Sequence, residues 1–279
     1  MEASRERLTG KNRVVIKIGS SSLTHELTGN LNLQKMEHLV RILCDLRNQG
    51  MDVILVSSGA IAAGRKVLGL PERPKKMSLK QACAAAGQAN LMMIYQKLFY
   101  EYHQISGQIL MTKYSVMDAK SLENITNTFE ELLGLGVIPI VNENDTVATE
   151  EIDFGDNDRL SAIVAAITGA DLLILLSDID GLYTDDPSKN SEAVFIPEVE
   201  RLTDRYRSMG KESAGAAGTG GMAAKLAAAE LAVSAGADMV IANANDLENI
   251  YRILKGERVG TWFAADKDEQ FDLRDYLKA

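Results

Sequence analysis

Seven carboxylates lie between residues 143 and 158, with no Lys or Arg among them. They are Glu143, Asp145, Glu150, Glu151, Asp153, Asp156 and Asp158. Like charges packed this closely repel one another, and burial increases the repulsion. Such a segment either lies open in water or faces cations, which could be a metal ion, lysines from elsewhere in the chain or the ammonium group of a ligand. The segment follows an apolar run at residues 137–141, and open α/β sheets bind ligands beyond the ends of such strands.

Two lysines occupy positions where a positive charge costs free energy unless an anion or solvent offsets it. Lys17 lies inside a β-rich apolar run at residues 13–21, where a charge costs free energy unless it meets an anion or reaches the strand end. Lys225 lies in the first turn of a predicted Ala-rich helix, where its charge opposes the helix dipole. An anion bound between the helix end and this lysine would remove that penalty. The alternative for each lysine is an ordinary solvent-facing position.

Two stretches of small residues have the composition of anion-binding turns. They are SSGAIAAG at residues 57–64 and GAAGTGGMAAK at residues 215–225. Glycine lets backbone N–H groups approach a ligand, and in each case a helix follows. Neither stretch has the GxxxxGK[ST] or GxGxxG pattern, and a glycine-rich stretch alone also suits a flexible linker. Combined with two lysines and clustered carboxylates, however, the set suits phosphoryl transfer, in which cations stabilise the negative charge of the transferred group.

The elements that must position these residues alternate between strands and helices. Strands are predicted at residues 13–21, 51–56, 105–111, 137–141, 171–178, 238–242 and 259–263, with a weaker signal at 193–196. Helices are predicted at 33–48, 78–102, 121–133, from 156 or 157 to about 169, 225–235 and 247–254. Residues 20–30 are interpreted as a loop, 188–214 as irregular, 1–12 as a frayed leader, and 264–279 as a surface-covering or partly disordered tail. The alternation predicts an α/β fold with a mostly parallel sheet and helices on both faces.

Composition excludes several classes of protein. The 279 residues carry a net charge of −9, which argues against nucleic acid as the main partner. No apolar run reaches the roughly 18–20 residues of a membrane span, and the N-terminus lacks the apolar core of a signal peptide. We therefore expect a cytoplasmic protein without a membrane partner. Cys44 and Cys83 are expected to be buried thiols rather than a bridge, and three His without ligand spacing argue against a zinc site.

Five sequence motifs together resemble the amino acid kinase family, over about residues 13–263. They are VVIKIGSSSL, VSSGAIAAG, VIPIVNENDTVATEEIDFGDNDRLSA, LLILLSDIDGLYTDDP and GTGGMAAK. The NENDTVA and FGDND sequences are specific to the members that phosphorylate L-glutamate, whereas the glycine-rich motif and the Lys17 strand are shared more widely. The resemblance implies a three-layer αβα sandwich about a mainly parallel, roughly eight-stranded sheet. Its N-terminal part would bind glutamate and its C-terminal part ATP.

The reaction implied by the resemblance is transfer of the γ-phosphate of ATP to the side-chain carboxylate of L-glutamate, the first step of proline biosynthesis. Lys17 and Lys225 would stabilise the transferring group, and Asp158 would orient both lysines. Ser57, Asp145 and Asn157 match glutamate-binding positions, with Asp145 accepting the α-ammonium group. The positions that match the ATP site are Lys17, Ser177, Asp178, Thr219, Gly220, Gly221, Met222, Ala223, Ala224 and Lys225. Mg²⁺ would enter on the ATP phosphates with few protein ligands.

Further expectations follow from the same resemblance. L-Proline would inhibit at or near the glutamate site, and the protein would form a dimer or tetramer. Many relatives carry a C-terminal PUA domain, an RNA-binding type of module, and none is expected here after residue 263. Two alternatives remain open. One is a relative that phosphorylates aspartate, N-acetylglutamate, a carbamate or a nucleotide, which the charge of Asp145 disfavours. The other is a catalytically silent amino-acid-binding regulator, which retention of both lysines disfavours.

Overall fold

The computed structural model describes residues 4–147, 156–187, 189–213 and 221–278. The chain divides into two compact units, each with its own set of contacts. The terminal unit consists of Met1–Lys17 and Asp158–Ala279, and the internal unit is Ile18–Asn157.

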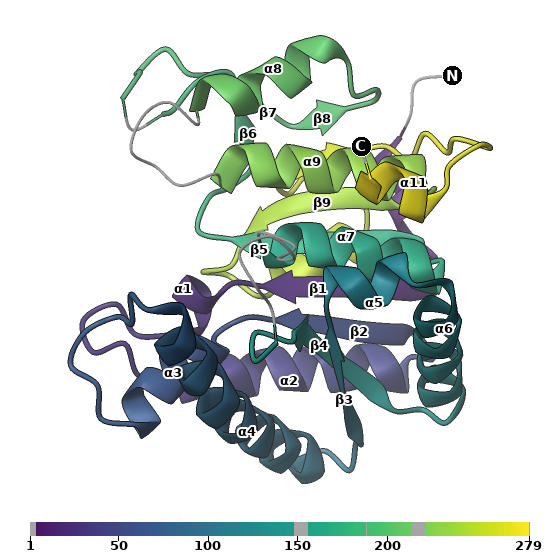
Figure 1. Ribbon diagram of the computed structural model, residues 1–279. Coiled ribbons are helices and arrows are strands. Elements are labelled where there is room, and N and C mark those ends of the chain that lie inside the picture. Colours follow the sequence, from purple (N-terminus) through teal and green to yellow (C-terminus); the bar gives the residue numbers. More distant parts are fainter. Residues whose placement is uncertain (1–3, 148–155, 188, 214–220, 279) are drawn as a thin grey trace. The chain divides into compact units, whose positions relative to one another are not determined.

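The strands form a mainly parallel eight-stranded sheet (Figure 1). In the internal unit β3 (Ser106–Met111), β4 (Ile138–Glu143) and β2 (Asp52–Ser57) pair in this order, and both pairings are parallel. In the terminal unit the order is β1 (Arg13–Ile18, all but its last residue), β5 (Leu172–Ser177), β9 (Asp238–Asn243), β10 (Thr261–Phe263) and β8 (Glu198–Val199). The pairing of β9 with β10 is antiparallel, whereas β5 with β9 and β10 with β8 are parallel. A separate antiparallel pair joins β6 (Leu182–Tyr183) to β7 (Phe195–Ile196).

Helices of the internal unit pack directly on its strands. α2 (Leu33–Asn48) contacts β2, α6 (Ala119–Gly134) contacts β4, and α4 (Met77–Glu101) contacts β3 and α2. α3 (Ala60–Val67) crosses α4 (Figure 1), and α1 (Ser20–Leu23) and α5 (Lys113–Met117) are short. The apolar face of α2 buries Met36, Leu39, Val40 and Leu43. Leu33 is 56% exposed because it is the first residue of the helix.

Helices of the terminal unit bury its central strands. α9 (Gly221–Ser234) and α10 (Asn249–Leu254) pack on β9, and α8 (Asp204–Ser213) packs on α9. α7 (Asn157–Thr168) carries buried Leu160, Ile163 and Val164, whose i, i+3, i+4 spacing places them on one face of the helix. The strand predicted at residues 171–178 is confirmed by β5, and every residue of β5 is buried, as suits a strand covered on both faces of a parallel sheet.

Three helical segments lie where a frayed leader, a loop or irregular chain was predicted, so those predictions are wrong. They are the 3-10 helix η1 (Arg5–Leu8), α1 and α8, and one more short helix, α11 (Leu273–Lys278), lies in the C-terminal tail. Each is short or strongly polar, so its sequence lacks the apolar periodicity that identifies longer helices. The leader is not frayed over residues 4–12. Leu8 has no exposed area, and the buried Arg5 side chain donates to the carbonyls of Glu257 and Val259 among others.

Two further predictions concern the thiols and the membrane. Cys44 and Cys83 are both buried and unbridged, as expected. Burial raises the pKa of the Cys44 thiol to about 12, which keeps it protonated and unreactive at neutral pH. Within the described residues, every helix is too short or too polar to cross a bilayer.

Candidate functional site

Asp158 holds two lysines that come from distant parts of the chain. Lys17 lies in β1, Asp158 in the first turn of α7 and Lys225 in α9. Lys17 Nζ lies 2.5 Å from Asp158 Oδ1, and Lys225 Nζ lies 3.0 Å from Asp158 Oδ2. All three residues belong to the terminal unit. The structure thus brings together the three residues for which sequence analysis expected catalytic roles. We call this group the lysine–aspartate trio.

The trio is buried and carries a net positive charge. Asp158 is 4% exposed and each lysine is 8% exposed. Burial alone raises the pKa of Asp158, but the charges and hydrogen bonds of Lys17 and Lys225 outweigh it, so the pKa lies below its usual value. The carboxylate therefore stays ionised at neutral pH and neutralises only one of the two ammonium groups. A buried excess of one positive charge favours an anionic ligand, and phosphate is such a ligand.

The first turn of α9 adds a second anion-attracting feature. Lys225 Nζ lies 3.4 Å from the carbonyl oxygen of Gly221, the first residue of this 14-residue helix, so the ammonium group lies near its N-terminus. The first N–H groups of a helix have no intrahelical partner and attract anions. Met222, Ala223 and Ala224 are partly exposed in this turn. Thr219 and Gly220 lie outside the described residues.

Polar side chains gather where β5 and β9 end. Ser177 Oγ donates to Asp178 Oδ1 at 3.0 Å, with Ser177 buried and Asp178 exposed. Ser177 is in register with Asn243, whose Nδ2 donates to Asp180 Oδ1 at 2.7 Å. Ser177 and Asp178 were predicted from the sequence as site residues, whereas Asn243 and Asp180 were not. Both were findable, because each follows an apolar run that ends at this edge of a parallel sheet.

A chain of amide side chains lies in the internal unit. Asn157 Nδ2 donates to Ser58 Oγ at 2.6 Å and to Asn142 Oδ1 at 2.9 Å. Asn142 Nδ2 in turn donates to Gln88 Oε1 at 3.0 Å. Of these residues only Asn157 was named from the sequence, because a buried Gln in a long Ala-rich helix gives no distinct sequence signal. We call Gln88, Asn142 and Asn157 the amide relay.

The other two residues predicted to bind glutamate, Ser57 and Asp145, lie at strand ends of the internal unit. Ser57 is the last residue of β2, and its hydroxyl is 2.8 Å from the hydroxyl of buried Tyr95. Asp145 follows β4 and is partly exposed, in a turn that is closed by a hydrogen bond from Val147 N to Asn144 O at 3.1 Å. Of the other predicted acidic residues, Glu143 ends β4 and is buried, while Glu150, Glu151 and Asp153 lie outside the described residues.

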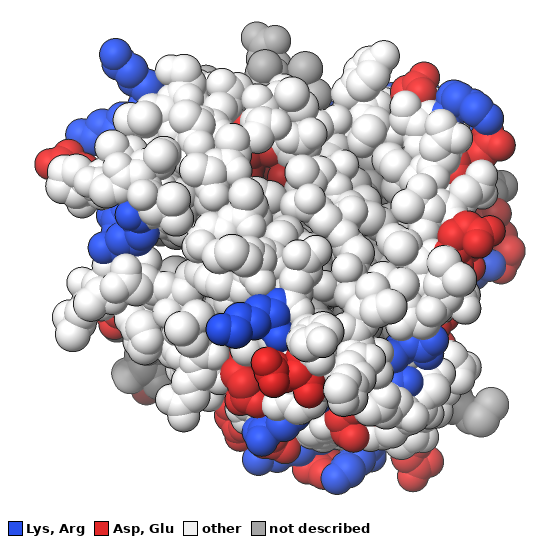
Figure 2. All heavy atoms as spheres, turned by 90° about the horizontal axis from the view of Figure 1, so that it is seen from below, with Lys and Arg blue, Asp and Glu red and all other residues white. Residues whose placement is uncertain are grey.

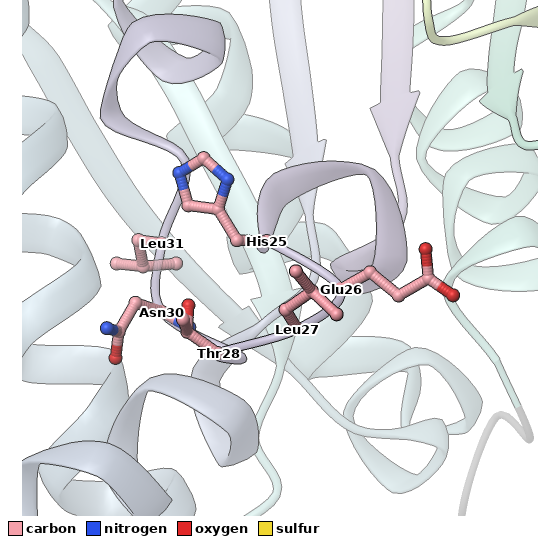
Figure 3. Close-up of a pocket in the computed structure, with 6 residues that line it drawn as sticks. All are labelled: His25, Glu26, Leu27, Thr28, Asn30 and Leu31. Atoms are coloured by element: carbon pink, nitrogen blue, oxygen red, sulfur yellow. The ribbon is translucent and has the colours of Figure 1, made fainter.

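A cavity of about 590 Å³ lies in the loop between α1 and α2 (Figure 3). Six residues of this one loop line it, namely His25, Glu26, Leu27, Thr28, Asn30 and Leu31. The loop closes on itself through hydrogen bonds from His25 N to Asn30 O and from Gly29 N to His25 O. None of the residues predicted to bind a substrate lines this cavity, so we place no part of the site there.

Comparison with known sequences gives a consistent match. Residues 12–243 match the model of the amino acid kinase family. The chain is 55% identical over 267 residues to a glutamate 5-kinase of Carboxydothermus hydrogenoformans, covering 96% of this chain and 72% of that protein. It is 53% identical to a glutamate 5-kinase of Clostridium acetobutylicum, covering 94% of this chain and 98% of the relative.

Comparison with solved structures supports the fold. The isopentenyl phosphate kinase of T. acidophilum superposes with a TM-score of 0.62 at 18% identity, covering 90% of this chain and all of that one. UMP kinase from Bacillus anthracis superposes with a TM-score of 0.61 at 17% identity, covering 92% of this chain and 97% of the other. Identities this low indicate a shared architecture. They agree with the mainly parallel sheet surrounded by helices that the sequence predicted.

Proposed function

Because the chain belongs to the amino acid kinase family, we propose that it transfers the γ-phosphate of ATP to the side-chain carboxylate of L-glutamate. The products would be ADP and L-glutamyl 5-phosphate, and the reaction is the first step of L-proline biosynthesis. The observation that carries the proposal is the buried lysine–aspartate trio, whose net positive charge suits a phosphoryl group. The acceptor is inferred from relatives at 53–55% identity that are named glutamate 5-kinase.

The proposed chemistry assigns a distinct task to each member of the trio. A carboxylate oxygen of glutamate attacks the γ-phosphorus as the bond from this phosphorus to the β,γ-bridging oxygen breaks, and ADP leaves with the bonding electrons. Lys17 and Lys225 stabilise the negative charge on the transferred group. Asp158 keeps both ammonium groups in place and does not itself exchange a proton, because its pKa lies below the usual value. No general base is needed, since the attacking carboxylate is already ionised at neutral pH.

Binding of ATP is assigned to the terminal unit. We place the triphosphate at the N-terminus of α9, with Lys17, Lys225 and the stretch from Thr219 to Ala224 around it, and the nucleoside near Ser177 and Asp178. Mg²⁺ enters as the ion of the Mg²⁺–ATP substrate and offsets the charge of the phosphates. The support is the anion-attracting helix end and the polar group where β5 and β9 end.

Binding of glutamate is assigned to the internal unit. Ser57 ends β2 and Asp145 follows β4, and α/β sheets bind ligands at such strand ends. Asn157 begins α7 and donates to Asn142 in β4. Asp145 would accept the α-ammonium group of the substrate, which explains why an enzyme for an acidic substrate carries a carboxylate there. An acylated amine has no charge to meet this carboxylate, and a nucleotide phosphate would be repelled by it.

The proposed function also includes regulation and assembly. We infer that the enzyme acts in the cytoplasm, that L-proline inhibits it at or near the glutamate site, and that it forms a homodimer or homotetramer. Support for assembly comes from large apolar side chains left exposed on α4 and β3 and next to them, including Met93, Tyr100, Ile105 and Leu110. Figure 2, which views the molecule from the side where α4 lies at the bottom of Figure 1, shows a broad area free of charged side chains. Such a surface is typical of a protein interface.

The test is an assay for the acyl phosphate itself. The protein is incubated with Mg²⁺–ATP, hydroxylamine and one acceptor at a time: L-glutamate, L-aspartate, N-acetyl-L-glutamate, carbamate or UMP. ADP release is measured throughout, with and without L-proline, and hydroxamate is measured for the three amino-acid acceptors. Glutamate is expected to give both products at rates well above those of the other acceptors. Faster ADP release with another acceptor would reassign the substrate, and no acceptor-dependent ADP release would exclude kinase activity.

A further inference from the structure

We propose that Gln88 is a positioning residue that fixes the side-chain amide of Asn157, so that the carbonyl oxygen of Asn157 meets the α-ammonium group of the acceptor. The inference rests on the proposed function and adds a determinant of acceptor choice to it. Gln88 acts through Asn142 and touches no substrate. Its effect is on the orientation of an amide, whose two ends have opposite hydrogen-bonding character.

The amide relay has one direction of donation. Gln88 Oε1 accepts from Asn142 Nδ2 at 3.0 Å, and Asn142 Oδ1 accepts from Asn157 Nδ2 at 2.9 Å. Asn157 Nδ2 donates its second hydrogen to Ser58 Oγ at 2.6 Å. An amide nitrogen has two hydrogens, and both are used here. Asn157 Oδ1 is therefore the polar atom of this side chain that can meet a ligand, and it can only accept a hydrogen bond.

Burial restricts the hydrogen-bond partners that are available to the amide relay. Gln88 is 8% exposed and Asn142 is 4% exposed, so neither amide can exchange its partner for bulk water without cost. Rotating Asn157 by half a turn would set its oxygen against Asn142 Oδ1, and two acceptors would then face each other. The relay thus holds Asn157 in one of its two amide orientations.

Helix α4 holds Gln88 rigidly because it packs unusually close to α3. A Cβ on Gly87 would lie 1.8 Å from the carbonyl oxygen of Ala60, and a Cβ on Gly64 would lie 1.7 Å from that of Cys83. Only glycine permits this approach at either position. Since Gly87 precedes Gln88 directly, the crossing of the two helices fixes both the height and the rotation of the Gln88 side chain.

Helix α4 also makes a buried hydrogen bond to β2, the strand that ends at Ser57. Tyr95 lies seven residues after Gln88 and therefore on the same face of α4. Its hydroxyl is 2.8 Å from Ser57 Oγ at the end of β2, while Gln88 reaches Asn142 in β4. One helix thus ties the ends of both strands through buried hydrogen bonds. Because Gln88 belongs to a set of buried hydrogen bonds between α4 and two strand ends, the arrangement supports a positioning role for Gln88.

The orientation of Asn157 predicts which ligand chemistry it recognises. A carbonyl oxygen attracts an ammonium group and gives nothing to a ligand that lacks a donor. Glutamate and glutarate share both carboxylates and differ in the α-ammonium group alone. We therefore infer that the relay contributes to the preference for an amino acid over a plain dicarboxylate, alongside Asp145.

The test compares L-glutamate with glutarate in three variants of the full chain. Gln88→Met removes the acceptor and keeps the length of the side chain, Gln88→Glu keeps an acceptor oxygen, and Gln104→Met is the control. Gln104 donates to Asn48 at 2.8 Å on the exposed surface, away from the relay. We measure KM for L-glutamate and for ATP, kcat, and the Ki of glutarate as a competitive inhibitor. Circular dichroism and thermal unfolding report folding.

Gln88→Met is expected to raise KM for L-glutamate about tenfold, corresponding to one weakened contact with a charged group. The KM for ATP and the Ki of glutarate should stay within about twofold, since neither ligand meets Asn157 Oδ1 through a donor. Gln88→Glu should recover most of the loss, and Gln104→Met should match the parent. An unchanged KM for glutamate in folded Gln88→Met, or equal weakening of glutamate and glutarate, would overturn the inference.

Two further measurements keep this inference separate from the proposed function. If Gln88→Met does not fold, Asn142→Asp replaces it, because its carboxylate still accepts from Asn157 Nδ2 and should keep the preference for glutamate over glutarate. A loss of that preference would overturn the inference. If the parent protein forms no glutamyl phosphate, the proposed function fails alone, and the shift in unfolding temperature caused by L-glutamate against glutarate still tests the relay in every variant.

Discussion

Lys17 Nζ lies 2.5 Å from Asp158 Oδ1, and the opposite oxygen of the same carboxylate meets Lys225. A buried carboxylate with one lysine would be a neutral pair, and its only evident role would be structural. The second lysine changes this, because it leaves the buried group with one positive charge more than negative. Such an excess costs free energy in the free protein and is relieved when an anion binds. The trio therefore combines some loss of stability with affinity for a phosphoryl group.

Removal of the Lys225 ammonium group should abolish most of the activity. In Lys225→Ala, kcat for glutamate-dependent ADP release is expected to fall by about 10²–10³-fold, the cost typical of losing one group that stabilises transition-state charge. The matched control is Lys120→Ala, whose ammonium group pairs with Glu123 on the exposed surface. The control should retain near-normal turnover. Near-normal turnover of Lys225→Ala itself would refute the role assigned to this lysine.

Neutralising Asp158 should destabilise the fold and inactivate the protein. Asp158→Asn leaves two buried lysines without their shared carboxylate, which should lower the free energy of unfolding by about 3–5 kcal/mol. Urea unfolding at pH 7 measures the loss. An unfolding free energy equal to that of the parent would show that the trio does not contribute to stability.

The difference in unfolding free energy between the parent protein and Asp158→Asn should depend on pH. Folding lowers the pKa of Asp158 below its ordinary value of 3.8. The ionised carboxylate therefore contributes stability at pH values above that ordinary value, and the contribution is lost as the pH falls through the lower folded-state pKa. The difference between parent and Asp158→Asn should be constant from about pH 7 to 5 and shrink below about pH 4. A difference that grows in acid would contradict the direction of this shift.

Close packing of α3 on α4 should make Gly87 intolerant of a methyl group. In Gly87→Ala the new Cβ would lie 1.8 Å from backbone, so the helices must separate, at a cost of about 3 kcal/mol in the free energy of unfolding. The separation also displaces Gln88, so KM for L-glutamate should rise more than KM for ATP. Gly134→Ala in α6 is the control, because nothing lies within 4 Å of its Cβ, and it should be neutral or stabilising by about 0.5–1 kcal/mol. Equal stability of the two variants would contradict the close packing.

Strong periodic patterns explain which elements were predictable. α2 was predicted at residues 33–48 and is found there, because its apolar positions repeat at the helical period and glycine follows its end. β5 was predictable for a different reason, since an uninterrupted apolar run between turn residues suits a strand covered on both faces. Lys17 and Lys225 were found because a charge in an apolar strand or at a helix start conflicts with its surroundings.

Residues that depend on distant partners could not be predicted in the same way. Gln88 and Tyr95 are unremarkable in a helix of small and apolar residues, and their importance becomes visible only when β2 and β4 are brought to that helix. α8 is polar over most of its length and is defined by packing on α9. The N-terminal leader resembled a frayed end because its charges have no local partners, and they find them at the far end of the sequence.

Arg5 should prove essential for the stability of the terminal unit. Its guanidinium donates to the carbonyls of Glu257, Val259, Pro197 and Gly260, and it also pairs with Glu198 at 3.4 Å. Burial lowers the pKa of Arg5, and the nearby Glu198 carboxylate only partly offsets this effect. A guanidinium group nevertheless stays charged at neutral pH. Arg5→Met removes every donor at once and should lower the free energy of unfolding by about 3–5 kcal/mol.

Two comparison variants make the prediction for Arg5 specific. Arg5→Lys keeps the charge but replaces a planar fork with a single ammonium group, which cannot reach four carbonyls together, so it should recover less than half of the loss. Arg201 is 78% exposed and pairs with Asp266 at 3.4 Å, so Arg201→Ala should cost less than about 1 kcal/mol. Urea unfolding of the three variants distinguishes the cases. If Arg5→Met were as stable as Arg201→Ala, the contacts of Arg5 would contribute little to stability, which is the behaviour expected of the frayed leader that the sequence predicted.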